Sequence, residues 1–268
     1  MNVLILTGGI SQRMGRDKAL IERPDGSRQI DHVIALAKRV SDRVFLSTRD
    51  LNDRGTGLPL LLDEVPGSGP TAALAAAAAT DLRGPWLVLG CDLFLLDAPT
   101  IAHLIAHRDP SRGATAYRNR IDGRAEPLCT IYEESSINPA KDAPRCARKY
   151  LESLDPLVLD LPFPAALDNA NTPADLAEAF EKLKRGTVSK AVSLLYFAIL
   201  REARGLSSES VETLAWTAAG LYEELSFRHR FPLEASQLRV ARNGEFAGWA
   251  APVEDGDEFV FMPPVAGG

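Results

Sequence analysis

Short apolar runs that alternate with helical patterns constrain the fold of the first part of this chain more than any other feature. Consecutive apolar positions of this kind are typical of strands that are buried on both faces of a parallel sheet. The runs cover Val3–Leu6, Arg43–Leu46, Leu58–Leu62 and Trp86–Leu89. Between them, we expect helices over Ile30–Val40 and over the alanine-rich run Thr71–Thr80. This order predicts an α/β domain with right-handed crossovers.

The pattern changes in the last third of the chain, which indicates a second domain. A helix with Thr172 as its N-cap is expected to end near Leu183. The polar segment Lys184–Thr187 is the best candidate for a boundary, so we expect one domain over 1–185 and another over 190–268.

The second domain combines short strands with one helix. The helix is expected over Leu214–Phe227, and Asn243-Gly244 has the composition of a hairpin turn. The expected strands are Val192–Phe197, Val211–Thr213, Leu238–Ala241 and Glu258–Met262. Two strands, a helix and further strands in so short a stretch predict a small α+β roll.

Composition excludes several classes of function. The 268 residues carry a formal net charge of -6, which argues against a broad nucleic-acid surface. No apolar segment approaches the roughly 18 residues of a membrane span, and the N-terminus lacks the features of a secretory leader. Cys91, Cys129 and Cys146 have neither disulfide nor zinc spacing, so we expect a cytoplasmic protein.

The first apolar run leads into a glycine pair and a basic loop. Glycines allow backbone N–H groups to approach a phosphate, and the cations that follow could neutralise a triphosphate. The spacing fits neither a Walker A loop nor a dinucleotide fingerprint. By composition alone, a tight strand–helix turn with solvated charges explains the run equally well. The candidate nucleotide contacts are Leu6, Thr7, Gly8, Gly9, Arg13 and Lys18.

Further motifs follow in order. They are Asp63–Pro70, Gly90–Leu93 and Asn169–Pro173. Together with the glycine run, they resemble the signature of the molybdenum cofactor guanylyltransferases, over about the first 180 residues. The resemblance implies a Rossmann-like nucleotidyltransferase domain that transfers GMP from GTP to molybdopterin and releases pyrophosphate.

Asp92 is the strongest candidate within these motifs. It lies just past the end of an expected parallel strand, where α/β folds place ligands, and its carboxylate suits Mg²⁺. A plain strand-end cap is the alternative. The resemblance implies catalytic roles for Lys18 and Asp92 and a nucleotide contact for Asp63. It also suggests that Asn169 and Asn171 orient the metal or the pterin phosphate.

Three departures from the family pattern leave other activities open. The family usually has alanine in place of Thr7, often has asparagine in the segment Ser47–Arg49, and commonly has histidine in place of Glu126. A degenerate transferase that serves as a scaffold for a carrier, or a cytidylyl or sugar-phosphate transferase, is therefore an alternative.

The end of the chain carries a second motif. Pro263 and Pro264 cannot continue a central strand, and the terminal Gly267-Gly268 is thin and flexible. A frayed terminus would explain the glycines alone. However, Leu195–Ala203 and Val240–Glu245 also resemble the small sulfur-carrier subunit of molybdopterin synthase.

This second resemblance implies a β-grasp, ubiquitin-like domain that is not itself a catalyst. Gly268 would be adenylated and converted to a thiocarboxylate. The implied partners are the large subunit of molybdopterin synthase and an ATP-dependent adenylating enzyme.

Overall fold

The computed structural model describes residues 1–7, 17–49, 51–63, 70–138, 140, 146–161, 165–187 and 189–263. The chain divides into two compact units. The N-terminal unit comprises Met1–Leu161 and Ala165–Phe180, and the C-terminal unit includes Glu181–Gly268. No helix of the described residues is long and apolar enough to span a membrane.

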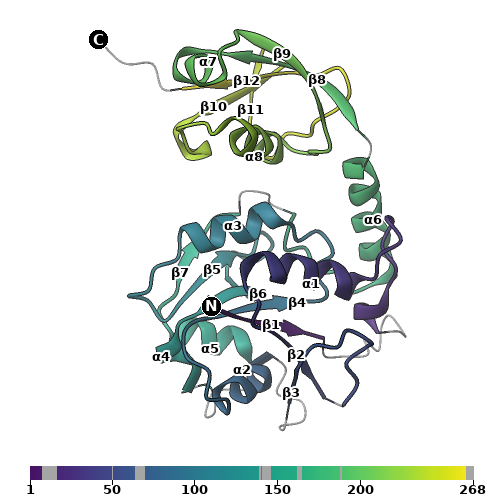
Figure 1. The fold of residues 1–268 in the computed structure, drawn as a ribbon, viewed down its shortest axis with the longest axis vertical. Coiled ribbons are helices and arrows are strands. Elements are labelled where there is room, and N and C mark those ends of the chain that lie inside the picture. Colours follow the sequence, from purple (N-terminus) through teal and green to yellow (C-terminus); the bar gives the residue numbers. More distant parts are fainter. Residues whose placement is uncertain are drawn as a thin grey trace. The chain divides into compact units, whose positions relative to one another are not determined.

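A seven-stranded sheet forms the centre of the N-terminal unit, in the order β3-β2-β1-β4-β6-β5-β7 (Figure 1). Its strands are β1 (Asn2–Leu6), β2 (Val44–Thr48), β3 (Leu60–Leu62), β4 (Trp86–Gly90), β5 (Ala114–Arg118), β6 (Ala125–Tyr132) and β7 (Leu157–Leu159). The four predicted strands are present and mutually parallel, as expected.

The sheet as a whole is mixed, because it also contains strands that were not predicted. β6 pairs antiparallel with both β4 and β5. The reason is the short connection between β5 and β6, in which the Asn119 N–H donates to the Arg124 carbonyl oxygen over 2.7 Å. A connection of this length can only join antiparallel strands.

Helices cover both faces of this sheet (Figure 1). α1 (Gln29–Val40) and α3 (Ala98–Ala106) pack on one face. The opposite face is covered by α2 (Pro70–Ala78), α4 (Glu134–Ile137) and α5 (Ala147–Ser153). The small side chains of α2, including fully buried Ala73 and Ala77, allow it to approach the sheet closely.

α6 (Pro173–Thr187) follows and differs from its predicted extent. Its start is as predicted, because Thr172 and Asp175 form reciprocal bonds: the Asp175 N–H donates to Thr172 Oγ1 over 3.2 Å, and the Thr172 N–H to Asp175 Oδ2 over 2.8 Å. The helix then continues through Lys184–Thr187, the polar segment that the composition predicts as a domain boundary.

The C-terminal unit is a five-stranded sheet with one long helix. The strands are β8 (Lys190–Tyr196), β9 (Ser208–Thr213), β10 (Arg239–Arg242), β11 (Glu245–Ala247) and β12 (Glu258–Met262), in the order β11-β10-β12-β8-β9. The first and last strands, β8 and β12, are parallel neighbours, and the other pairs are antiparallel. Its helices are α7 (Ala198–Arg204), α8 (Ala218–His229) and the short η3 (Ala235–Gln237).

The core of this unit lies between α8 and the sheet. Leu221 and Leu225 of α8 are fully buried in the same cluster as Phe259 and Phe261 of β12. α8 begins later than predicted, because Thr217 is its N-cap and accepts a hydrogen bond from a backbone N–H of the first turn. The unit has the β-grasp arrangement expected from the sequence.

Candidate functional site

The carboxyl ends of four parallel strands bring the predicted site residues to one edge of the N-terminal sheet. Thr7 follows β1, Thr48 ends β2, Asp63 follows β3 and Asp92 lies just after β4. Because β6 is antiparallel to β4 and Leu89 pairs with Cys129, the first residues of β6 lie at this same edge. We call it the carboxyl edge.

Lys18 connects two of the sequence motifs at this edge. It opens the short 3₁₀ helix η1 (Lys18–Leu20), and its Nζ lies 3.7 Å from Asp92 Oδ2. The same Nζ donates a hydrogen bond of 2.9 Å to Asn171 Oδ1. The Lys18 side chain is 12% exposed, so its charge is only partly screened by solvent.

Two opposing effects act on the pKa of Asp92. Burial raises the pKa of Asp92, and the positive charge of Lys18 opposes this shift. Gly90 leaves room for the carboxylate, since a Cβ there would lie 2.8 Å from Asp92 Oδ1. The strand end thus presents one carboxylate and one ammonium group side by side.

The segment Asn169–Asn171 runs beside Asp92. The Ala170 N–H donates to the Asp92 carbonyl oxygen over 3.3 Å. Oδ1 of Asn169 is buried, and no hydrogen-bond partner reaches it within the part of the chain that the structure describes. A buried amide oxygen without a donor is costly unless another group binds it.

This donor set suits Mg²⁺. Asp92 and Asn169 offer a carboxylate and an amide oxygen, and Mg²⁺ is typically bound by one or two carboxylates plus substrate phosphates. The described residues contain no cluster of three or more histidine, cysteine or acidic side chains that could hold a metal alone.

The Asp63 carboxylate at the same edge accepts a hydrogen bond from the protein itself. Ser47 Oγ donates to Asp63 Oδ1 over 2.7 Å, and Thr7 Oγ1 donates to the Ser47 carbonyl oxygen over 2.8 Å. Burial raises the pKa of Asp63, and the Ser47 hydroxyl and Arg49 oppose this shift. Two of the departures from the family pattern therefore lie in one hydrogen-bonded group.

Glu126, the third departure, is buried at the start of β6. Its carboxylate accepts hydrogen bonds from Asn119 Nδ2 over 2.9 Å and from the Leu128 N–H over 3.2 Å, and Arg148 Nη2 lies 3.5 Å away. Burial raises the pKa of Glu126, and the negative charge of Asp92 adds to the rise. The Glu126 side chain is therefore a buried and hydrogen-bonded carboxyl group whose charge interacts with that of Asp92.

Arg54 also lies at the carboxyl edge, and no motif predicts it. Its guanidinium contacts both the Thr7 carbonyl oxygen and the Asp17 carboxylate, although it lies in a loop with an ordinary polar composition. Nothing in the local sequence indicates that this arginine points inward.

The candidate residues fall into two groups. Leu6, Thr7, Lys18, Asp63 and Asp92 lie along the carboxyl edge. Gly8, Gly9, Arg13 and Gly268 lie outside the described residues.

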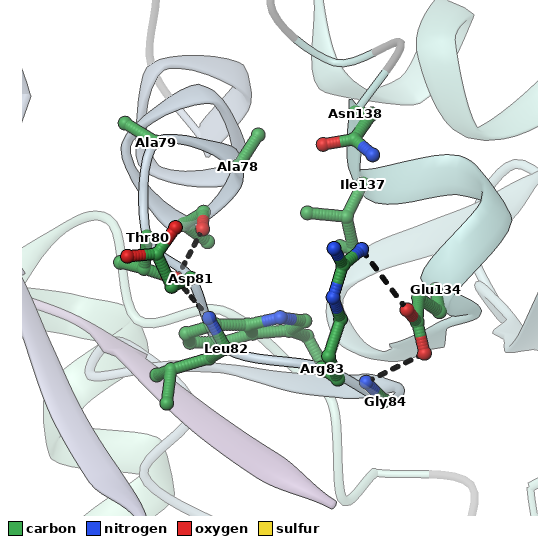
Figure 2. A pocket seen from close by; sticks show the side chains of 12 residues that line it. Ala78, Ala79, Thr80, Asp81, Leu82, Arg83, Gly84, Glu134, Ile137 and Asn138 are labelled. Carbon is green, nitrogen blue, oxygen red and sulfur yellow. Dashed lines mark hydrogen bonds and ion pairs between the residues drawn. The ribbon is translucent and has the colours of Figure 1, made fainter.

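A polar pocket of about 260 Å³ lies at the opposite edge of the sheet (Figure 2). The end of α2, Trp86 at the start of β4, and Glu134 and Asn138 in and after α4 contribute to its lining. Arg83 Nη1 lies 3.6 Å from Glu134 Oε1. The other carboxylate oxygen, Glu134 Oε2, accepts a hydrogen bond of 2.7 Å from the Gly84 N–H. Because β4 begins here and ends beside Asp92, this pocket does not belong to the candidate site.

In the C-terminal unit, β12 leads directly to the tail. Phe261 of β12 pairs with Tyr196 of β8, and Pro263 is the last described residue. An ion pair joins the end of α7 to β9 in this unit, because Arg204 donates two hydrogen bonds of 2.8 and 2.7 Å to Glu209. The Tyr196 hydroxyl also donates to Glu209, over 2.8 Å.

Two family models match the chain. The MobA-like NTP transferase domain matches residues 3–157, and the ThiS family matches residues 194–268. The two matches fall on the two compact units.

Relatives and solved structures agree with these matches. A molybdenum cofactor biosynthesis bifunctional protein of Synechocystis sp. is 31% identical over 182 residues, which cover 65% of this chain and 52% of that protein. The match thus spans about half of that relative. A probable molybdenum cofactor guanylyltransferase of Nostoc sp. is 31% identical, with 66% of this chain and 89% of that protein covered. Molybdopterin-guanine dinucleotide biosynthesis protein A of Archaeoglobus fulgidus shares the fold, with a TM-score of 0.56, 23% identity, and coverage of 68% and 97%.

Proposed function

Because this chain belongs to the MobA-like NTP transferase domain family, we propose that its N-terminal unit transfers the guanylyl group of GTP to the terminal phosphate of molybdopterin. A phosphate oxygen of the pterin attacks the α-phosphorus of GTP and forms a new P–O bond. The bond from the α-phosphorus to the bridging oxygen of the β-phosphate breaks, and pyrophosphate leaves. The chain is a nucleotidyltransferase joined to a ThiS family domain.

The observation that carries this proposal is the position of Lys18 between Asp92 and Asn171, 3.7 Å from one and 2.9 Å from the other. Phosphoryl chemistry of this kind depends mainly on positioning and on neutralising charge. The Lys18 ammonium would bind a phosphate oxygen of GTP and stabilise the negative charge that develops on the leaving pyrophosphate.

Mg²⁺ would be held by Asp92 and Asn169. The bound metal would supply positive charge that neutralises the phosphates of GTP. The buried Asn169 oxygen and the Asp92 carboxylate support this assignment. Asp63, held by Ser47, would orient the nucleoside at the neighbouring strand end.

The test is pyrophosphate release from GTP or CTP with Mg²⁺ and molybdopterin as the acceptor. We expect GTP to be preferred and Asp92→Asn to reduce turnover at least 100-fold, because an electrostatic group at the transition state is lost. Asp81→Asn, at the opposite edge in the polar pocket, is the matched control and should retain wild-type turnover. Full activity of Asp92→Asn would contradict the assignment, and preference for CTP would identify a cytidylyltransferase.

For the C-terminal unit, we propose that Gly268 carries sulfur as a thiocarboxylate. The ThiS family match and the β-grasp fold support this role. An ATP-dependent enzyme would adenylate and sulfurate the carboxylate, and the large subunit of molybdopterin synthase would accept the sulfur. The proposed compartment is the cytoplasm, since Cys91, Cys129 and Cys146 are free thiols.

An extended tail tests this second role. One added alanine moves the terminal carboxylate by about 3.5 Å, which should stop sulfur transfer while leaving GTP turnover unchanged. Molybdopterin formation with the large subunit, together with intact mass, measures both the transfer and the state of the tail. Normal sulfur transfer by a variant whose mass retains the extra alanine would disprove the role of Gly268.

A further inference from the structure

Arg54 lies between β2 and β3, and its side chain is only 8% exposed. Its Nε donates to Asp17 Oδ2 over 2.8 Å, and its Nη2 donates to the Thr7 carbonyl oxygen over 3.3 Å. Nη1 donates to Thr48 Oγ1 and to the Asn52 carbonyl oxygen over 3.4 and 3.0 Å. One guanidinium therefore joins the carboxyl ends of β1 and β2 to Asp17.

The backbone of Arg54 is held in an unfavourable conformation to achieve this. Its φ of 56° is in the left-handed region, which large side chains rarely adopt. The turn is held by Asn52 Oδ1, which accepts the Arg54 N–H over 2.9 Å, and by the Asp53 carboxylate, which accepts the N–H groups of Gly55 and Gly57 over 3.0 and 2.8 Å. A glycine would adopt this φ without strain, so the arginine contributes through its side chain. Such strain is typical of functional positions.

Asp17 links Arg54 to the short helix that begins at Lys18. One oxygen of Asp17 binds Arg54, and the other caps η1 by accepting the N–H of its second residue over 3.0 Å. Lys18 is the first residue of η1 and reaches Asp92 and Asn171. Fixing Asp17 therefore fixes the point from which the Lys18 side chain extends.

We propose that Arg54 is a positioning residue for nucleotidyl transfer, which acts through Asp17 to hold Lys18 against Asp92. This inference rests on the proposed function, in which Lys18 binds the phosphates of GTP. Arg54 itself has its donors directed at protein oxygens rather than at substrate.

Arg54→Gly is the most direct test, because it removes the guanidinium while relieving the backbone strain at this φ. We expect kcat/KM for GTP to fall about 100-fold, since a displacement of about 1 Å from reacting geometry has an effect of this size. Arg54→Lys, which keeps a donor for Asp17, should recover part of the loss. Arg108→Ala is the matched control. Arg108 donates two hydrogen bonds, of 2.7 and 2.6 Å, to the Glu133 carboxylate at the edge of the sheet opposite the carboxyl edge.

Non-additivity separates positioning from general destabilisation. In a Lys18→Ala background, Arg54→Gly should lower kcat/KM by less than about threefold, because residues that act as a unit do not add. An equal loss in both backgrounds, or wild-type kcat/KM in Arg54→Gly, would overturn the proposal.

A readout without turnover distinguishes failure of this inference from failure of the proposed function. Acetylation of lysines, followed by mass spectrometry, should be several-fold faster at Lys18 in Arg54→Gly than in the wild type, with exposed Lys38 as the internal reference. If the wild type does not turn over GTP but Lys18 becomes reactive, the proposed function fails, whereas the coupling by which Arg54 holds Lys18 in place stands. If the reactivity of Lys18 does not change, the positioning role fails.

Discussion

Replacing Gly90 with alanine tests how strongly activity depends on the position of the Asp92 carboxylate. A Cβ at this position would lie 2.8 Å from Asp92 Oδ1 and 3.1 Å from Leu128 Cβ, so both side chains would crowd it. Ordinary contact begins at 3.4 Å, so the carboxylate must move by about 0.6 Å, the difference between 3.4 and 2.8 Å. If a displacement of 1 Å has an effect of about 100-fold, Gly90→Ala should lower kcat/KM for GTP roughly tenfold.

The assay is pyrophosphate release at subsaturating GTP, combined with thermal unfolding. Overpacking in a buried strand also destabilises a protein by about 1–3 kcal/mol, so the control must share that effect. Gly113→Ala does so, because its Cβ would lie 2.6 Å from the Leu154 carbonyl oxygen at the opposite edge of the sheet. We expect Gly113→Ala to lower the unfolding temperature while the folded enzyme keeps its kcat/KM. Wild-type kcat/KM in Gly90→Ala would refute the reasoning.

Two further predictions concern charge. Lys18→Ala should weaken GTP binding about tenfold and make the remaining affinity less dependent on salt, because a charge-assisted contact is lost; titrations at two ionic strengths measure this, and an unchanged salt dependence would contradict it. Arg204 and Tyr196 lower the pKa of Glu209 to about 2, so its contribution is complete above about pH 4.5 and is lost as the pH falls toward 2. Glu209→Gln should therefore destabilise the C-terminal unit by about 2 kcal/mol at neutral pH and flatten its acid unfolding curve, which denaturant titrations at pH 7 and pH 3 would detect.

The strands that were predicted from the sequence are those whose burial is visible locally. β1 and β4 are buried on both faces and therefore consist of continuous apolar runs. β12 was predicted with its observed bounds, Glu258–Met262, because a run of apolar residues follows the turn residues Asp255–Asp257. Asp92 could be placed for the same reason, since the end of a buried parallel strand predicts a ligand position.

β5, β6 and β7 of the N-terminal sheet were not predicted, because they lack such a signal. β6 contains Glu126 and Pro127, which are uncommon in a central strand, and it is buried nonetheless. Glu126 is tolerated there because its carboxylate accepts hydrogen bonds from Asn119 and Leu128. The hydrogen bond from Asn119 forms only once β5 and β6 pair as a hairpin, so the strand and its antiparallel pairing could not be inferred from the apolar pattern alone.

The site depends on contacts that no local pattern contains. Motifs identified Lys18 and Asn171 separately, and their hydrogen bond joins positions 153 residues apart. Arg54 lies in a segment that every local rule assigns to a surface turn, and its left-handed φ favours glycine. Only the inward contacts with Asp17 and Thr7 distinguish it from an ordinary turn residue. Motifs therefore predict the groups that are proposed to bind substrate, whereas the residues that contact those groups become visible only when distant segments are folded together.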